Sequence, residues 1–122
     1  MEILEPNGVY ESSAPNSRAV VHNDTVYVSG IVGISPDSGE YGDSMAEQTR
    51  YAFQNLEATL EEADSALDQV LRILVFMDDE DDKSSMDEVY REFLSEPYPA
   101  RAAMFTEFSG VTQLEIVATA YR

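Results

Sequence analysis

The sequence contains no cysteine and no tryptophan, and only one lysine and one histidine among its 122 residues. The absence of cysteine excludes disulfide scaffolds, thiolate zinc sites and cysteine nucleophiles. The single histidine, His22, excludes metal sites built from several histidines and argues against a histidine-based catalytic triad. Because 43% of the residues are hydrophobic, a chain of this length can bury an ordinary core. We therefore expect one domain over residues 1–122.

Basic residues are scarce: 7 stand against 24 acidic residues, which gives a formal net charge of -17. Such a surface repels phosphate backbones and anionic lipid, so we expect neither nucleic acid nor a membrane as a partner. An acid-rich, nearly lysine-free composition is typical of proteins that work in concentrated salt, and a halophilic source is favoured over an acidic mesophilic one. No apolar run approaches the ~20 residues of a membrane span, and the first nine residues do not resemble a signal peptide. We therefore expect a cytoplasmic protein.

The hydrophobic pattern predicts the element order β-β-α-β-α-β-β. Strands are expected over residues 18–23, 25–29, 70–77, 100–108 and 114–121, and helices over residues 44–63 and from about 84 to 94. Ser44 with Glu47, and Ser85 with Glu88, form capping-box patterns that place the two helix starts. Gln48 falls on the predicted polar side of the first helix.

The last two strands are expected to form a hairpin around residues 109–112. The resulting fold class is α+β, with one sheet covered on one face by two helices. Depending on the register, the other face receives Ala103, Phe105, and either Ile116 or Val117. Because a small domain with an uncovered apolar sheet face tends to associate, we expect an oligomer.

Three stretches in order resemble the Rid/YjgF family of reactive-intermediate imine/enamine deaminases, also called the L-PSP endoribonuclease family. Residues 26–63 hold a strand ending in Ser-Gly, a Pro-x-Ser-Gly turn, and a helix with Glu-Gln-Thr and Asn-Leu. Residues 70–93 form the second stretch. The third, residues 98–121, contains Pro99-Ala100-Arg101 and Leu114-Glu115-Ile116. The resemblance spans nearly the whole chain, and its specificity lies in the ordered combination of motifs.

This resemblance implies a chorismate-mutase-like fold and a homotrimer whose sheets form an inner barrel, with a cleft between each pair of neighbouring subunits. It also implies hydrolysis of 2-imino or 2-enamino acids to 2-keto acids and ammonia, without a cofactor or a metal. The expected partners are therefore a small 2-imino or 2-keto acid and two further copies of the chain.

Arg101 and Glu115 are the candidate catalytic residues. Arg101 lies in an apolar stretch, where its guanidinium can either pair with a surface acid or hold a substrate carboxylate through a fork of donors. The match to the Pro-Ala-Arg motif favours the second interpretation. Glu115 can be an outward residue of an alternating strand, or it can hold the attacking water and return a proton to departing ammonia. The family position favours the second role.

Four further residues are the candidate substrate-binding residues. Gly30 permits close backbone approach and Ser29 offers a hydroxyl, although a bulged strand end explains both nearly as well. The backbone of Ala103 is expected to bind the substrate carboxylate or water. Asn16 stands where many family deaminases have a tyrosine, and Tyr10 lies close enough in sequence to fill the gap.

Two other departures from the family pattern are Ala102-Ala103, where Ser-Cys is usual, and Asp87, where asparagine is usual. These departures leave a second hypothesis open, namely a non-catalytic trimer that binds small carboxylates for regulation. Ribonuclease activity ranks third, because the net charge of -17 opposes RNA binding.

Overall fold

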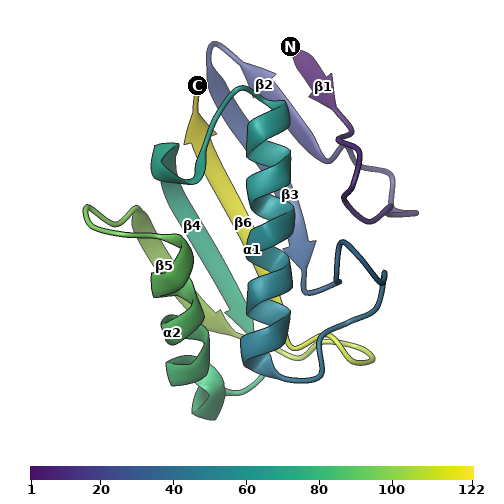
Figure 1. Ribbon diagram of the computed structural model, residues 1–122, viewed down its shortest axis with the longest axis vertical. Helices are drawn as coiled ribbons and strands as arrows, with labels where there is room; N and C mark the ends of the chain where they lie inside the picture. The colour runs from purple at the N-terminus through teal and green to yellow at the C-terminus, as the bar shows by residue number, and fades with distance from the viewer.

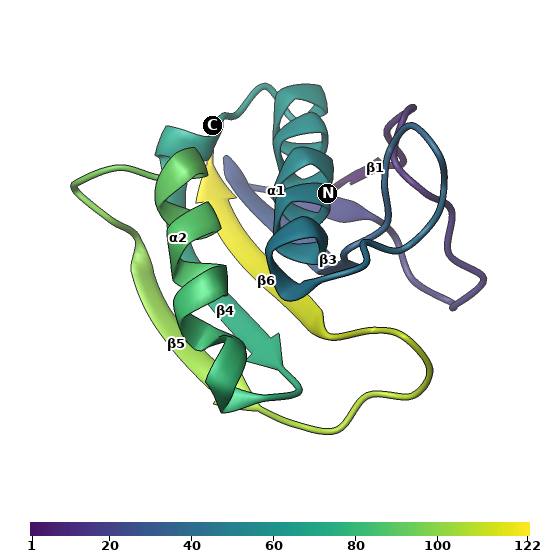
Figure 2. The same cartoon turned by 60° about the horizontal axis from the view of Figure 1, so that its bottom comes forward.

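The computed structural model describes all 122 residues and has two helices and six strands. The strands are β1 (Glu2–Leu4), β2 (Ala19–His22), β3 (Thr25–Val32), β4 (Val70–Met77), β5 (Ala100–Phe105) and β6 (Leu114–Tyr121), and the helices are α1 (Met45–Glu62) and α2 (Lys83–Phe93). Both helices lie on the same face of a single sheet, as Figures 1 and 2 show from two directions. The predicted α+β class is confirmed, and β1 is an additional strand.

Helix α1 begins where the capping box places it. The Ser44 hydroxyl accepts a hydrogen bond from the Glu47 amide, and the Glu47 carboxylate accepts one from the Asp43 amide. Its buried stripe includes Phe53, Leu56 and Leu60, which are fully inaccessible to solvent. Gln48 is a correction to the sequence-based prediction, because it is buried on the core side of the helix.

The strand order is β1-β2-β3-β6-β4-β5, and only β4 and β5 run parallel. The predicted terminal hairpin is therefore wrong: β6 enters between β3 and β4, and β5 forms the sheet edge beyond β4. The physical reason is the crossover through α2, which returns the chain to the far side of β4 in parallel. The connection after β5 then crosses the end of β4, where the Thr106 amide donates to Met77 and the Asp78 amide donates to Gln113.

Several element boundaries also differ from the prediction. Strand β5 ends at Phe105, three residues before the predicted end at Phe108. Helix α2 begins at Lys83, and its N-cap residue Asp82 makes no side-chain cap, so Ser85 lies inside the helix. Strand β3 continues past Ser29 to Val32, because a bulge lets the strand pass residues 29–30 and resume its pairing with β6. The predicted turn at Asn23-Asp24 is confirmed by their positive φ angles of 50° and 62°.

The helices cover one face of the sheet and leave the other face open. Ile73, Val75 and Ile116 face the helices and are buried, so Ile116 belongs to the core. The uncovered face carries apolar side chains that are half-buried or exposed: Tyr27, Leu74, Phe76, Met104 and Val117. This result selects Val117 for the open face. The expectation that Ala103 and Phe105 lie on the open face is wrong, because the register of β5 places them beside the buried Val75 and Met77, on the helix-covered side. Neither helix has the length and hydrophobicity needed to cross a membrane.

Candidate active site

Arg101 projects from the edge strand β5 toward helix α2. Its neighbour across the sheet is the buried Ile73, which fixes the side chain on the helix-covered face. The guanidinium lies 4.8 Å above the Tyr90 ring centre and 2.7 Å from an Asp87 carboxylate oxygen. Only 24% of the Arg101 side chain and 16% of the Asp87 side chain are exposed. Arg101 is therefore a half-buried cation with one ion pair and one aromatic contact.

The Asp87 carboxylate lies between two cations, because the Lys83 ammonium is 3.3 Å from its second oxygen. Burial raises the pKa of Asp87, but Arg101 and Lys83 together outweigh burial and hold the pKa below its usual value of 3.8. Burial likewise raises the pKa of the Tyr90 hydroxyl, which Arg101 only partly offsets. Asp87 is therefore charged and Tyr90 protonated near neutral pH. Tyr90, Tyr98 and Pro99 line a pocket of about 240 Å³ beside Arg101.

Glu115 belongs to a second pocket, of about 400 Å³, on the other side of the sheet. Gly30 lies directly against it: a Cβ added to Gly30 would come within 2.6 Å of a Glu115 carboxylate oxygen. This close approach explains why glycine is needed at the bulge in β3. Asn16 and Tyr10 line the same pocket, so the structure brings three predicted site residues together: Asn16, Gly30 and Glu115.

Ser29 is next to this pocket, but its hydroxyl donates to the Ser17 carbonyl oxygen, and its amide donates to the Arg18 carbonyl oxygen. In this conformation Ser29 therefore holds the segment that carries Asn16. Tyr10 has a similar supporting role, because its hydroxyl accepts a hydrogen bond of 2.9 Å from the Val32 amide.

Sequence reasoning missed Arg18, which is 6% exposed and lines the Glu115 pocket. Its guanidinium lies over the Tyr10 ring and donates to the carbonyl oxygens of Gly30 and Tyr10. None of the ion pairs in the structure includes it. Its position as the first residue of a predicted strand gave no sign of this burial, and the strand itself begins one residue later, at Ala19.

Within one chain, the two candidate catalytic residues lie on opposite faces of the sheet. Glu115 alternates with the buried Leu114 and Ile116 and pairs in register with Phe76 and Val32 on the open face. Arg101 and Ala103, two residues apart on β5, lie on the helix-covered face. Arg101 and Ala103 therefore form one half-site, and Asn16, Gly30 and Glu115 form another.

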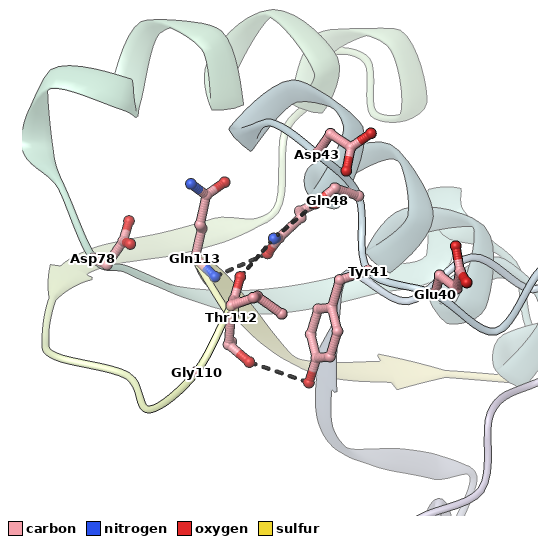
Figure 3. A pocket seen from close by; sticks show the side chains of 10 residues that line it. Glu40, Tyr41, Asp43, Gln48, Asp78, Gly110, Thr112 and Gln113 are labelled. Atoms are coloured by element: carbon pink, nitrogen blue, oxygen red, sulfur yellow. Dashed lines mark hydrogen bonds between the residues drawn. The ribbon is translucent and has the colours of Figure 1, made fainter.

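Gln48 positions the start of β6 and was also missed by sequence reasoning. Its amide group donates to the carbonyl oxygens of Gly42 and Val111 and accepts from the Gln113 amide, at distances of 2.8–3.0 Å. Figure 3 shows this side chain between the two loops, with the hydrogen bond from Thr112 to Tyr41 beside it. Because Gln113 is two residues before Glu115, the buried amide fixes the backbone that carries the candidate base.

Comparisons with known proteins show the family of this chain. The profile of the family described as Endoribonuclease L-PSP matches residues 9–122. A RutC family protein of Pyrococcus horikoshii is 32% identical over 126 residues, which cover 99% of this chain and 98% of that protein. The chain belongs to the Rid/YjgF family. The human 2-iminobutanoate/2-iminopropanoate deaminase is another Rid/YjgF relative, 32% identical over 73% of this chain and 66% of its own length.

Solved structures place the fold in the same family. The crystal structure of RidA from an Antarctic Psychrobacter matches all of this chain and all of that chain with a TM-score of 0.95 and 30% identity. TdcF of E. coli with bound serine matches 100% of this chain and 99% of that chain, with a TM-score of 0.93 and 26% identity. The chorismate-mutase-like fold expected from the family resemblance is confirmed.

Proposed function

We propose that this Rid/YjgF protein is a hydrolytic deaminase that converts reactive 2-imino and 2-enamino acids to 2-keto acids and ammonia. The observation that carries the proposal is the state of Arg101. Its guanidinium is fixed over Tyr90 and pairs through one nitrogen with Asp87, the only acid with which it forms an ion pair. The donors that do not face Asp87 can therefore bind a substrate carboxylate.

In the proposed reaction, Arg101 holds the carboxylate and Glu115 orients one water molecule toward the imine carbon. The carboxylate of Glu115 takes a proton as the water oxygen bonds to that carbon, and it returns the proton to the nitrogen. Glu115 then takes the hydroxyl proton of the resulting carbinolamine and passes it to the nitrogen. The carbonyl forms as the carbon–nitrogen bond breaks, so that ammonia leaves and the 2-keto acid remains. Fixing one water beside the reacting carbon supplies much of the rate gain. The backbones of Gly30 and Ala103 and the side chains of Ser29 and Asn16 complete the proposed contacts.

The proposed site is composite, with Arg101 from one subunit and Glu115 from its neighbour in a homotrimer. Two observations support this arrangement. The two side chains leave opposite faces of the sheet, so one chain cannot direct both at the same small molecule. The open face also presents an apolar surface that a second copy can cover, with Tyr27 and Met104 exposed at 52% and 37%.

The first test is the Arg101→Ala variant, assayed with 2-iminobutyrate or 2-iminopropionate generated in situ in molar potassium chloride. We expect hydrolysis to be lost while light scattering still reports a trimer. A control is Arg50→Ala, which removes a surface arginine of α1, on the helix side of the sheet, and breaks one ion pair, with Glu92, in which 40% and 55% of the two side chains are exposed. An unchanged rate in the Arg101 variant would falsify the mechanism.

The composite site has its own test by co-expression of Arg101→Ala with Glu115→Gln. Each mixed trimer then contains one interface with both intact residues, so random assembly of equal amounts restores about a quarter of the wild-type sites. Each single variant alone supplies the inactive baseline. If the mixture is as inactive as the single variants, the two residues do not meet across a subunit boundary.

A second function is favoured by Asn16, which leaves the Glu115 pocket without the tyrosine usual in family deaminases, and by the serine bound in the related TdcF structure. Under this alternative the trimer binds small carboxylates without turning them over. Titration with 2-oxobutyrate gives binding under both functions, whereas accelerated loss of the imine occurs only under the first. Wild-type protein that binds 2-oxobutyrate but does not accelerate imine loss would identify the alternative.

A further inference from the structure

Basic side chains gather at one place on this acidic chain. Arg91 and Arg101 line the pocket next to Tyr90. Lys83, the only lysine in the sequence, forms an ion pair with Asp87 of the same pocket. Three of the 7 basic residues thus line one small pocket or pair with its single acidic residue, in a chain with 24 acidic residues. The position is therefore suited to an anion that the rest of the surface repels.

Asp87 is the one negative charge in this cluster, and its Oδ1 atom lies 2.7 Å from one guanidinium nitrogen of Arg101. This ion pair engages that nitrogen and leaves the other guanidinium donors available to an anion. The Tyr90 hydroxyl is buried in the same pocket and has no hydrogen-bond partner. An unpaired donor beside a cation is the arrangement that a bound carboxylate satisfies.

We propose that Asp87 is a specificity-determining residue, which makes this site select a monocarboxylate with an uncharged side chain over a dicarboxylate. The inference rests on the proposed function, because it concerns the carboxylate that Arg101 holds. Any anion on Arg101 lies close to the Asp87 carboxylate and is repelled by it, and Lys83 offsets part of that repulsion. A second negative charge on the ligand adds to the repulsion, because Coulomb energies scale with the product of the charges.

The walls of the pocket support the same selection. Tyr90, Tyr98 and Pro99 present ring surfaces, which suit an apolar substituent on the ligand. The remaining cation at the rim, Arg91, is exposed and therefore screened by solvent and salt. Charge selection thus depends mainly on the half-buried pair of Asp87 and Arg101, where screening is weakest.

The test compares two probes on the full-length protein at fixed ionic strength: 2-oxobutyrate, with one negative charge, and 2-oxoglutarate, with two. Calorimetric titration gives the dissociation constant of each probe for wild type, Asp87→Asn, Lys83→Gln and the double variant. Glu88→Gln is the matched control, because it removes the neighbouring exposed acid of α2, which forms no ion pair. Thermal melting verifies that each variant is folded.

We expect Asp87→Asn to tighten 2-oxobutyrate about threefold and 2-oxoglutarate about tenfold, because the dianion feels the lost charge twice. Lys83→Gln shifts the selectivity in the opposite direction, the double variant lies near wild type, and Glu88→Gln changes nothing. If the dissociation constants of both probes change by the same factor, or if neither single variant changes their ratio, this inference is wrong and the proposed function still stands. If Arg101→Ala does not weaken 2-oxobutyrate, both this inference and the proposed function fail.

Discussion

Gly30→Ala should separate activity from stability in this protein. The added methyl would lie 2.6 Å from Oε1 and 2.9 Å from the carboxyl carbon of Glu115, where a real contact needs more than 3.0 Å. Gly30 does not have a positive φ angle, so alanine fits the backbone and the flexible end of Glu115 gives way instead. We expect the carboxylate to move by several tenths of an ångström. Displacements of about 1 Å cost about a hundredfold in rate, whereas a tolerated surface substitution changes stability by about 0.5 kcal/mol.

The assay follows ammonia release from 2-iminobutyrate formed in situ, together with urea denaturation of the same preparation. The double variant Gly30→Ala with Glu115→Asp shortens the acid by one methylene group and should recover part of the lost rate. Gly33→Ala is the contrasting control, because its added Cβ would lie 2.5 Å from the Gln48 backbone and should lower stability. If Gly30→Ala retains the wild-type rate, Glu115 does not need the position it has here, and the proposed role of its carboxylate is wrong.

Three further perturbations follow from the contacts described above. Gln48→Ala leaves the Gly42 and Val111 carbonyls and the Gln113 amide without partners, so we expect a loss of about 3 kcal/mol in the free energy of unfolding by urea. Ser44→Ala removes the N-cap of α1 and should cost about 1 kcal/mol in the same measurement, with Ser38→Ala as an exposed control. The third concerns pH. Because the folded-state pKa of Asp87 is below 3.8, its ion pairs contribute stability above that pH and lose it as the pH falls through and below 3.8. The stability difference between wild type and Asp87→Asn should therefore shrink from pH 7 to pH 3, and a constant difference would contradict the assignment.

The helices and most strands could be predicted because their signals are local. The Ser44 cap and the stripe through Phe53 define α1, and the apolar run of residues 70–77 defines β4 without error. The order of strands in the sheet is not local information. The loop between β5 and β6 is long enough either to form a hairpin or to cross the end of β4, and only tertiary packing decides between them. The burial of Gln48 was missed for a similar reason, since its partners are in loops far away in sequence.

The candidate site, like the fold, could be predicted only in part. Arg101, Glu115 and Gly30 were identified from family motifs, and the structure adds what the motifs do not contain. The ion pair of Arg101 with Asp87 joins a strand to a helix, and the separation of Arg101 from Glu115 depends on strand parity. Periodicity along one strand cannot give either relation, because both depend on the register between elements.

The sheet position of each half-site has a consequence for local rigidity. Glu115 is on β6, which is hydrogen-bonded to a strand on either side, whereas Arg101 is on β5, which has β4 as its only neighbour. Opening free energies within a protein are lowest for segments with few partners, so amide hydrogen exchange is expected to be faster in β5 than in β6. The group that would receive the ligand thus belongs to a segment able to adjust, and the group that would align the water belongs to one that stays in place.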